Sequence, residues 1–271
     1  MNWVGNLRSD LSLRNQQLAV ANGSLHELAA GEIPSVIFGQ NESGRHGNFH
    51  PASYRNILTN PSWARRLAKV HTSSRKVRLR AEWKWRELDC ANSSDALLMN
   101  VFCCRKSVEQ RALAAMLGVS PGLTPEFGFR PGIPLWNGRT DRTEVDMKLG
   151  DLLVEAKLTE TGFQAAPMAK VERYRDFEEV FHVSELGRAG DSIANYQLIR
   201  CVLAAYATGG SFCLLCDARR PDMIEKWFSV MRAVKSYVLR SRLHVLTWQE
   251  LAGVLPRAMR RFLEAKYGIV G

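Results

Sequence analysis

The chain has 271 residues, 46% of them hydrophobic, and can therefore bury a full core as one large domain or as one domain with an appendage. Its 37 lysines and arginines exceed its 27 acidic residues, and the net charge of +10 favours a polyanionic partner. The N-terminus lacks the apolar segment of a signal peptide, and the most apolar stretch, residues 198–216, is broken by Arg200 and Gly209-Gly210, so we expect a soluble cytoplasmic protein without a membrane span.

Residues 1–60 are rich in Asn, Gly and Ser, and a strongly basic segment follows them. Three tryptophans, Trp63, Trp83 and Trp85, are interleaved with its basic residues, which could bind phosphates while the indoles stack on bases. A solvated basic face with the tryptophans in the core is an equal alternative. We predict an N-terminal basic region over residues 1–90, packed on or appended to a core over residues 91–271. The candidate nucleic-acid-binding residues are Arg65, Arg66, Lys69, Arg75, Lys76, Arg78, Arg80, Lys84 and Arg86.

The rest of the chain alternates helical and strand patterns. Ser93 is a good N-cap for a helix over residues 93–102, and a second helix over 107–117 should stop at Gly118. An irregular strand at 127–129 comes before a hairpin. After the hairpin we predict helices over 192–207 and 222–239, strands over 212–216 and 243–246, and a last helix that ends at Gly268. This order indicates an α/β fold in which helices cover a sheet.

Residues 143–158 predict a β-hairpin that turns at Gly150-Asp151, a pair suited to a primed turn. Because side chains alternate faces along a strand, one face of the hairpin is apolar and the other collects charged groups. Asp151 lies in the turn, roughly 13 Å from the level of Glu155 at about 3.3 Å per residue, and is not expected among the ligands. The pairs are Leu149 with Leu152, Met147 with Val154, Asp146 with Glu155, and Glu144 with Lys157.

The charged face of the hairpin suits a metal site. Directly opposed acids repel each other, which folding alone would not select, although a plain solvated face is the alternative. Mg²⁺ takes one or two carboxylates with waters and phosphates, so we expect Asp146 and Glu155 to hold Mg²⁺, or Mn²⁺ in its place, with the Ala156 carbonyl as an extra ligand. Lys157 could orient the attacking water or neutralise developing charge, and Glu144 could hold Lys157 in place.

The six cysteines do not form a recognisable zinc pattern. Cys213 and Cys216 have CxxC spacing, but they lie in an apolar, strand-like run without a second pair or a histidine pair. We predict buried, reduced thiols, with a zinc or redox role as the weaker alternative. The sequence also lacks a Walker loop, a GxGxxG motif and a nucleophilic triad.

Asp146, eight intervening residues and Glu155-Ala156-Lys157 resemble the motif of the PD-(D/E)XK nuclease superfamily. Longer phrases, from about residue 50 onward, are similar to a bacterial group of proposed restriction endonucleases in that superfamily. These phrases cover residues 94–100, 138–146, 196–200, 217–221 and 246–251. The resemblance implies a restriction-endonuclease-like fold, which is a central mixed β-sheet flanked by helices, with Asp146 and Glu155 as metal ligands and Lys157 as the catalytic lysine.

Other family features are met only in part. Several branches place a Gln on the helix after this motif, and Gln197 sits at the matching place, with a buried structural Gln as the alternative. Many members use an acid on the first core helix, for which Asp95 and Glu109 are both candidates. Cys201 stands where RecB-like nucleases have a Tyr, and the four-cysteine spacing of iron–sulfur members is absent, which argues against a helicase-coupled exonuclease.

The leading hypothesis from the sequence is a Mg²⁺-dependent endonuclease that cleaves DNA in restriction or in phage or genome defence. Cutting both strands with one site per chain would favour a homodimer. The alternatives are a non-catalytic nucleic-acid-binding module on the same fold, and a structure-specific or RNA-directed nuclease of repair or recombination. The recognition sequence cannot be deduced from the residues.

Overall fold

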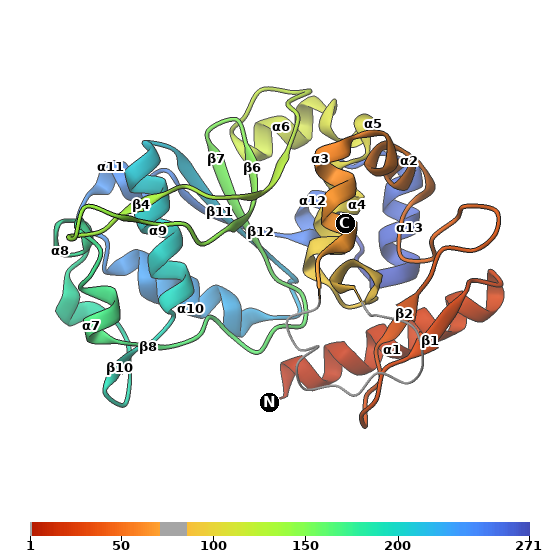
Figure 1. Cartoon of the computed structure of the whole chain (residues 1–271), viewed down its shortest axis with the longest axis horizontal. Coiled ribbons are helices and arrows are strands. Elements are labelled where there is room, and N and C mark those ends of the chain that lie inside the picture. The colour runs from red at the N-terminus through yellow and green to blue at the C-terminus, as the bar shows by residue number, and fades with distance from the viewer. Residues whose placement is uncertain (1, 71–85) are drawn as a thin grey trace. The chain divides into compact units, whose positions relative to one another are not determined.

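A computed structural model describes residues 2–70 and 86–271 (Figure 1). Five of the candidate DNA-binding residues, Arg75, Lys76, Arg78, Arg80 and Lys84, lie outside these ranges. The chain forms two compact units. The first contains Met1–Met116, Ser120–Leu123 and Trp248–Gly271, and the second contains Leu117–Val119 and Thr124–Thr247. The division into domains at residue 90 stays a prediction.

The first unit is mostly helical. Its long N-terminal helix α1 was not expected from the sequence, and it buries Leu7, Leu11, Asn15 and Ala19 at intervals of four residues, close to one helical turn. Helix α1 packs on α13, where Asn15 and the buried Lys266 hydrogen-bond through Oδ1 and Nζ at 2.6 Å. The elements are α1 (Trp3–Ala21), β1 (His26–Leu28), β2 (Val36–Phe38), α2 (Pro51–Thr59), α3 (Pro61–Ala64), η1 (Arg65–Ala68), η2 (Glu87–Asp89), α4 (Ser94–Phe102), α5 (Arg105–Val108), α6 (Arg111–Leu117), α12 (Trp248–Val254) and α13 (Arg257–Tyr267).

Helix α4 is the centre of the first unit, since all nine of its residues are buried. Ser93 caps it as predicted, and its hydroxyl accepts a hydrogen bond from the Ala96 N–H at 3.2 Å. Asn100 joins α4 to the preceding loop, because its side chain donates to the Asn48 carbonyl and accepts from the His50 N–H. The loop that contains Asn48 and His50 is therefore packed against α4 within the first unit.

The second unit is built on a mixed sheet with the strand order β12-β11-β7-β6-β3. Strands β7, β11 and β12 are parallel, whereas β6 is antiparallel to both β7 and β3. This confirms the predicted fold class, a central mixed sheet flanked by helices. The strands are β3 (Glu126–Phe129), β4 (Ile133–Pro134), β5 (Thr140–Asp141), β6 (Val145–Leu149), β7 (Leu152–Ala156), β8 (Ala166–Pro167), β9 (Arg188–Ala189), β10 (Ser192–Ile193), β11 (Ser211–Cys216) and β12 (Leu243–Thr247).

Helices α9 and α10 pack on β11, where α9 also contacts β7 and α10 also contacts β12 (Figure 1). The core beneath them contains Leu153, Phe212, Leu214 and Trp227. Glu155, on the charged face of the hairpin, is buried beneath α9 and contacts Gln197 and Cys201 of that helix. The remaining helices are α7 (Met168–Val171), α8 (Phe177–Val180), η3 (Val183–Glu185), α9 (Tyr196–Thr208), α10 (Pro221–Arg232) and α11 (Tyr237–Arg240).

Several predicted helices are divided or shortened. The helix expected over 192–207 begins only at Tyr196, because Ser192 and Ile193 pair with β8 and β9, and Asn195 adopts a left-handed φ of 56°. The pattern over 222–239 gives α10 and α11, since residues 233–235 bond to the segment 180–182 instead of continuing the helix.

The other two divisions are local. The helix expected over 107–117 gives α5 and α6, and Gly118 follows α6 with a φ of +67°. The last helix divides into α12 and α13 at Pro256, which has no N–H to donate and cannot continue α12. It ends before Gly268, as predicted, at a φ of +62°. Across residues 2–70 and 86–271, no helix is long and apolar enough to span a bilayer.

Candidate active site

The residue pairs nearest the turn have the register predicted from the sequence, whereas the predicted pairs Asp146–Glu155 and Glu144–Lys157 lie beyond the paired part of the strands. Leu149 pairs with Leu152 and Met147 with Val154, and Gly150 takes a φ of +61°, as the first central residue of a type II′ turn requires. Beyond the Met147–Val154 pair, the Asp146 side chain accepts a hydrogen bond from the Ala156 N–H at 2.8 Å. This bond brings the Asp146 carboxylate to the strand position directly after Glu155.

Glu155 is the most enclosed acid of the site, with 1% of its surface exposed. Its Oε1 accepts from the Lys157 ammonium at 2.6 Å and from the Gln197 amide on α9. Its Oε2 faces the Cys201 thiol at 3.9 Å, also on α9. Helix α9 therefore brings two polar side chains, one helical turn apart, onto the buried carboxylate. Gln197 thus contacts Glu155, another of the predicted site residues.

Lys157 is 7% exposed and forms a buried ion pair with Glu155. Burial lowers the pKa of the Lys157 ammonium, but the carboxylates around it, with Glu155 first among them, outweigh burial and raise the pKa above its ordinary value. Lys157 is therefore a cation inside the fold. Burial, together with the Glu155 charge, raises the pKa of the Cys201 thiol, so Cys201 stays a neutral hydrogen-bond donor.

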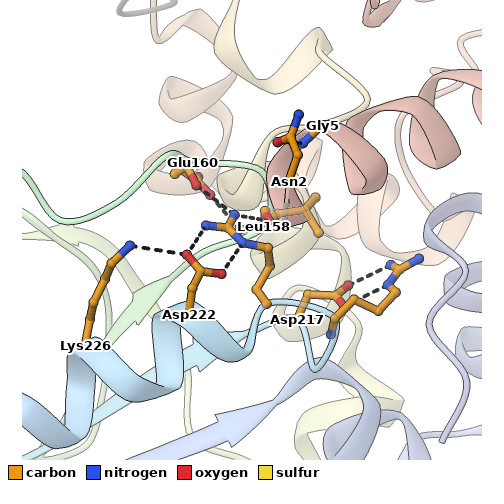
Figure 2. Close-up of polar contacts among 9 residues, drawn as sticks. Asn2, Gly5, Leu158, Glu160, Asp217, Asp222 and Lys226 are labelled. Carbon is orange, nitrogen blue, oxygen red and sulfur yellow. Dashed lines mark hydrogen bonds and ion pairs between the residues drawn. The ribbon is translucent and has the colours of Figure 1, made fainter.

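A buried arginine holds the chain that follows Lys157. Arg220 has no exposed surface and donates to the Glu160 carbonyl at 2.7 Å and, more weakly, to the Leu158 carbonyl at 3.5 Å. Its guanidinium also donates two hydrogen bonds, of 2.8 and 2.9 Å, to the Asp222 carboxylate. Figure 2 shows Leu158, Glu160 and Asp222 converging on this point, with Lys226 bound to Asp222 from the next turn. The start of α10 thereby holds the loop that follows β7.

The donor set fits a hard cation such as Mg²⁺. The recorded contacts of Glu155 leave its Oε2 with only a weak thiol neighbour, so this oxygen retains lone pairs for a ligand. The N–H and C=O of one strand residue point to the same side, which directs the Ala156 carbonyl toward Asp146. In the part of the chain that the structure describes, no three His, Cys, Asp or Glu side chains group as metal ligands. A Mg²⁺ site needs only one or two carboxylates when water and phosphate complete it.

The other predicted residues lie in different surroundings. Glu144 precedes β6 and forms an ion pair with Arg130 at 3.0 Å. In the first unit, the buried Asp95 on α4 binds Arg66 at 2.9 Å and Lys69 at 2.5 Å, so two of the candidate DNA-binding cations hold an acid. Arg65 and Arg86 are exposed, and Glu109 pairs with Arg105 on the surface. The choice between Asp95 and Glu109 stays open.

Three residues around the site were missed by sequence reasoning in these roles: Arg200, Cys201 and Arg220. Arg200 is 9% exposed, and its guanidinium donates to the Glu144 carbonyl at 3.4 Å. Arg220 belongs to the phrase 217–221 that carried part of the family resemblance, and the phrase was the available signal for it. All six cysteines are buried, as predicted.

A mixed sheet that presents a buried Glu-x-Lys strand beside an acid of the preceding strand defines an α/β protein with a restriction-endonuclease-like core. The chain belongs to the family described as Restriction Endonuclease associating with ARP, whose pattern matches residues 20–268. No curated protein and no solved structure is significantly similar to it. The family is one of restriction endonucleases, which implies DNA as its substrate. The matched residues belong to both compact units.

Proposed function

We propose that this protein is a Mg²⁺-dependent endonuclease that hydrolyses DNA phosphodiester bonds in restriction or in defence against foreign DNA. The observation that carries the proposal is the cluster at the end of β7, where Asp146, Glu155 and Lys157 meet beside Gln197 on a buried, braced strand. Membership of the restriction endonuclease family supports the same reaction class. Mn²⁺ is expected to substitute for Mg²⁺.

Each side chain has a role that follows from its contacts. Asp146, Glu155 and the Ala156 carbonyl would hold the cation, which supplies an activated water and a clamp on phosphate oxygens. Lys157 is a charged donor, and it would neutralise the negative charge that develops on the phosphate. Gln197 orients the Glu155 carboxylate through Oε1, which keeps Oε2 directed away from the amide.

The test is a substrate panel with the purified full chain. Linear and nicked duplex, single-stranded DNA, branched DNA and RNA are incubated with Mg²⁺, Mn²⁺ or EDTA, beside a Glu155→Gln variant and an exposed-acid control, Glu126→Gln, from β3 of the same sheet. We expect cleavage of duplex DNA that EDTA and Glu155→Gln abolish and Glu126→Gln leaves unchanged. Preferred cleavage of branched DNA or RNA would replace the restriction role with repair or RNA processing, and binding without cleavage of any substrate would indicate a non-catalytic module.

One active cluster per chain is oriented toward one strand, so we propose that cleavage of both strands uses a homodimer. Light scattering of the chain with a cognate duplex should then give a mass of two chains per DNA, and a single chain per DNA during double-strand cleavage would contradict the dimer.

A further inference from the structure

A cavity of about 540 Å³ lies within the second unit, beside α9. Four cationic side chains line it, and Asp141 is the acid among the lining residues. A cavity of this size is in the range that small molecules or single nucleotide units occupy in proteins. The cations are Arg142, Lys170, Arg173 and Arg200.

Asp141 offsets only one of these four positive charges, and its carboxylate is held in place by hydrogen bonds from neutral groups. It accepts hydrogen bonds from the N–H and the hydroxyl of Thr143, at 2.8 and 2.5 Å, and from the Tyr174 hydroxyl at 2.5 Å. The Tyr174 hydroxyl also contacts the Tyr196 hydroxyl at 2.7 Å. This chain of bonds fixes the wall of the cavity, and four cations against one carboxylate leave its positive charge in excess.

Arg200 is the buried member of the set. It is 9% exposed, and its recorded contact is the long 3.4 Å bond to the Glu144 carbonyl, which occupies one of its N–H groups. None of the other nitrogens of Arg200 is buried without a partner, so its remaining N–H groups open onto the cavity and are available to the acceptor oxygens of a ligand. None of the four cations forms an ion pair with a residue that the structure describes.

The cavity is next to the candidate active site. Tyr196 and Arg200 flank Gln197 on α9, and Gln197 binds Glu155. The carbonyl that Arg200 contacts belongs to Glu144, two residues before Asp146. The candidate metal-binding residues and the cavity are thus connected in two ways, through one turn of α9 and through the residues that lead into β6. Lys170 lies over the Tyr196 ring at 4.4 Å, which places a second cation at the same wall.

We propose that this cavity binds a phosphate group of the nucleic-acid strand adjacent to the bond that is cleaved. The proposal rests on the proposed nuclease function for the identity of the strand. Guanidinium groups match phosphate oxygens with paired hydrogen bonds, and three of the four cations are arginines. The phosphate is either an internal diester or the monoester at a 5′ end, since both present the same oxygens to the cavity.

The test measures binding without cleavage. The full chain in EDTA is titrated with three single-stranded DNAs of equal length: one with a 5′-phosphate, one with a 5′-hydroxyl, and a closed circle. The test variant is Arg142→Gln/Arg173→Gln. Its matched control, Arg188→Gln/Arg240→Gln, removes the same charge from two exposed arginines of the same unit that do not line the cavity. Arg200→Gln is a second test variant, with its melting temperature recorded to show that it folds.

We expect the cavity variant to bind about tenfold more weakly than the control variant, because charge-assisted hydrogen bonds are lost. Its plot of log Kd against log salt should be shallower by about 0.7 for each phosphate contact removed. A loss on all three DNAs assigns the cavity to an internal diester, and a loss confined to the 5′-phosphorylated strand assigns it to a terminal phosphate.

Equal affinity and equal salt dependence of the cavity and control variants on all three DNAs would overturn the proposal. The outcomes are separable from those of the nuclease proposal. If the cavity variant binds more weakly than the control and the wild type cleaves no substrate with any metal, the phosphate-binding proposal is supported and the nuclease proposal is contradicted. If the wild type cleaves DNA with metal and the cavity variant binds as tightly as the control, only the phosphate-binding proposal is contradicted.

Discussion

Glu155 is a buried carboxylate that two other predicted site residues contact. A charge with 1% exposure is costly unless it is paired, and here Lys157 and Gln197 both bind Oε1. The pair is therefore needed by the fold as well as by the proposed reaction. Removing one partner leaves the other charge buried without compensation, and this cost exceeds the net value of the pair itself.

Lys157→Met should consequently destabilise the protein as well as remove cleavage. We expect a loss of about 3–5 kcal/mol in the free energy of unfolding, measured by urea denaturation at pH 7. The control Lys106→Met removes an exposed lysine from α5 and should change the free energy by less than about 0.5 kcal/mol. A Lys157→Met variant as stable as this control would contradict the buried ion pair.

The cysteines should be unreactive in the native protein. All six are buried, burial with the nearby Asp89 and Glu87 charges raises the pKa of Cys90 to about 12, and burial with Glu155 raises that of Cys201. Titration with a disulfide reagent at pH 8 should label none of them before unfolding and all six in denaturant. Rapid labelling of a native thiol would show that at least one of these cysteines is accessible.

The sequence predicted Asp146, Glu155 and Lys157 because a short motif and the alternation of a strand define their common face. Arg200, Cys201 and Arg220 could not be found this way. Cys201 is 46 residues from Glu155, and Arg220 is 60 residues from the Glu160 carbonyl that it binds. Such contacts depend on how α9 and α10 pack on the sheet, which local patterns do not contain.

Among the secondary-structure elements, the turn of the hairpin and the Ser93-capped helix α4 were predictable, whereas the divisions of the longer helices were not. Gly150-Asp151 and the apolar alternation fix the register, so a shift by one residue would exchange the two faces. The division of α12 from α13 has a visible cause in Pro256. By contrast, the pattern over 222–239 stays apolar through the break between α10 and α11, where the bonds of residues 233–235 to the segment 180–182 override it.

The brace between α10 and the loop after Lys157 should depend on pH through Asp222. The bonds from Arg220 lower the pKa of Asp222 and outweigh burial, so the native carboxylate holds its charge better than the unfolded one. Its contribution to stability is fully present above the unfolded pKa of about 3.9 and is lost as the pH falls through the lower native value.

Asp222→Asn should therefore cost about 1–3 kcal/mol at pH 7, and the difference from the wild type should narrow below about pH 4. Urea unfolding at a series of pH values measures both. The control Asp191→Asn changes an exposed acid of the same unit and should follow the wild-type curve. A pH-independent difference for Asp222→Asn would contradict the proposed role of its charge.

For the whole molecule, the basic residues behind the net charge of +10 differ in whether they are paired with acids. Arg66 and Lys69 hold Asp95, whereas Arg142 and Arg173 line a cavity without an ion pair to a described residue. DNA affinity should fall with salt, roughly tenfold between 50 and 200 mM for two phosphate contacts on duplex DNA. Fluorescence anisotropy in EDTA measures this fall, and an affinity that does not change with salt would exclude phosphate contacts as the source of binding.

The assigned site is tested most directly by comparing Asp146→Asn with Asp151→Asn in metal-dependent DNA cleavage. The asparagine oxygen can still accept the Ala156 N–H bond, so Asp146→Asn should keep its stability within about 1 kcal/mol and lose cleavage by at least about 100-fold with either Mg²⁺ or Mn²⁺. Asp151, exposed in the turn, should be replaceable without effect. Undiminished cleavage by a folded Asp146→Asn protein, or loss of cleavage in Asp151→Asn alone, would contradict the assigned site.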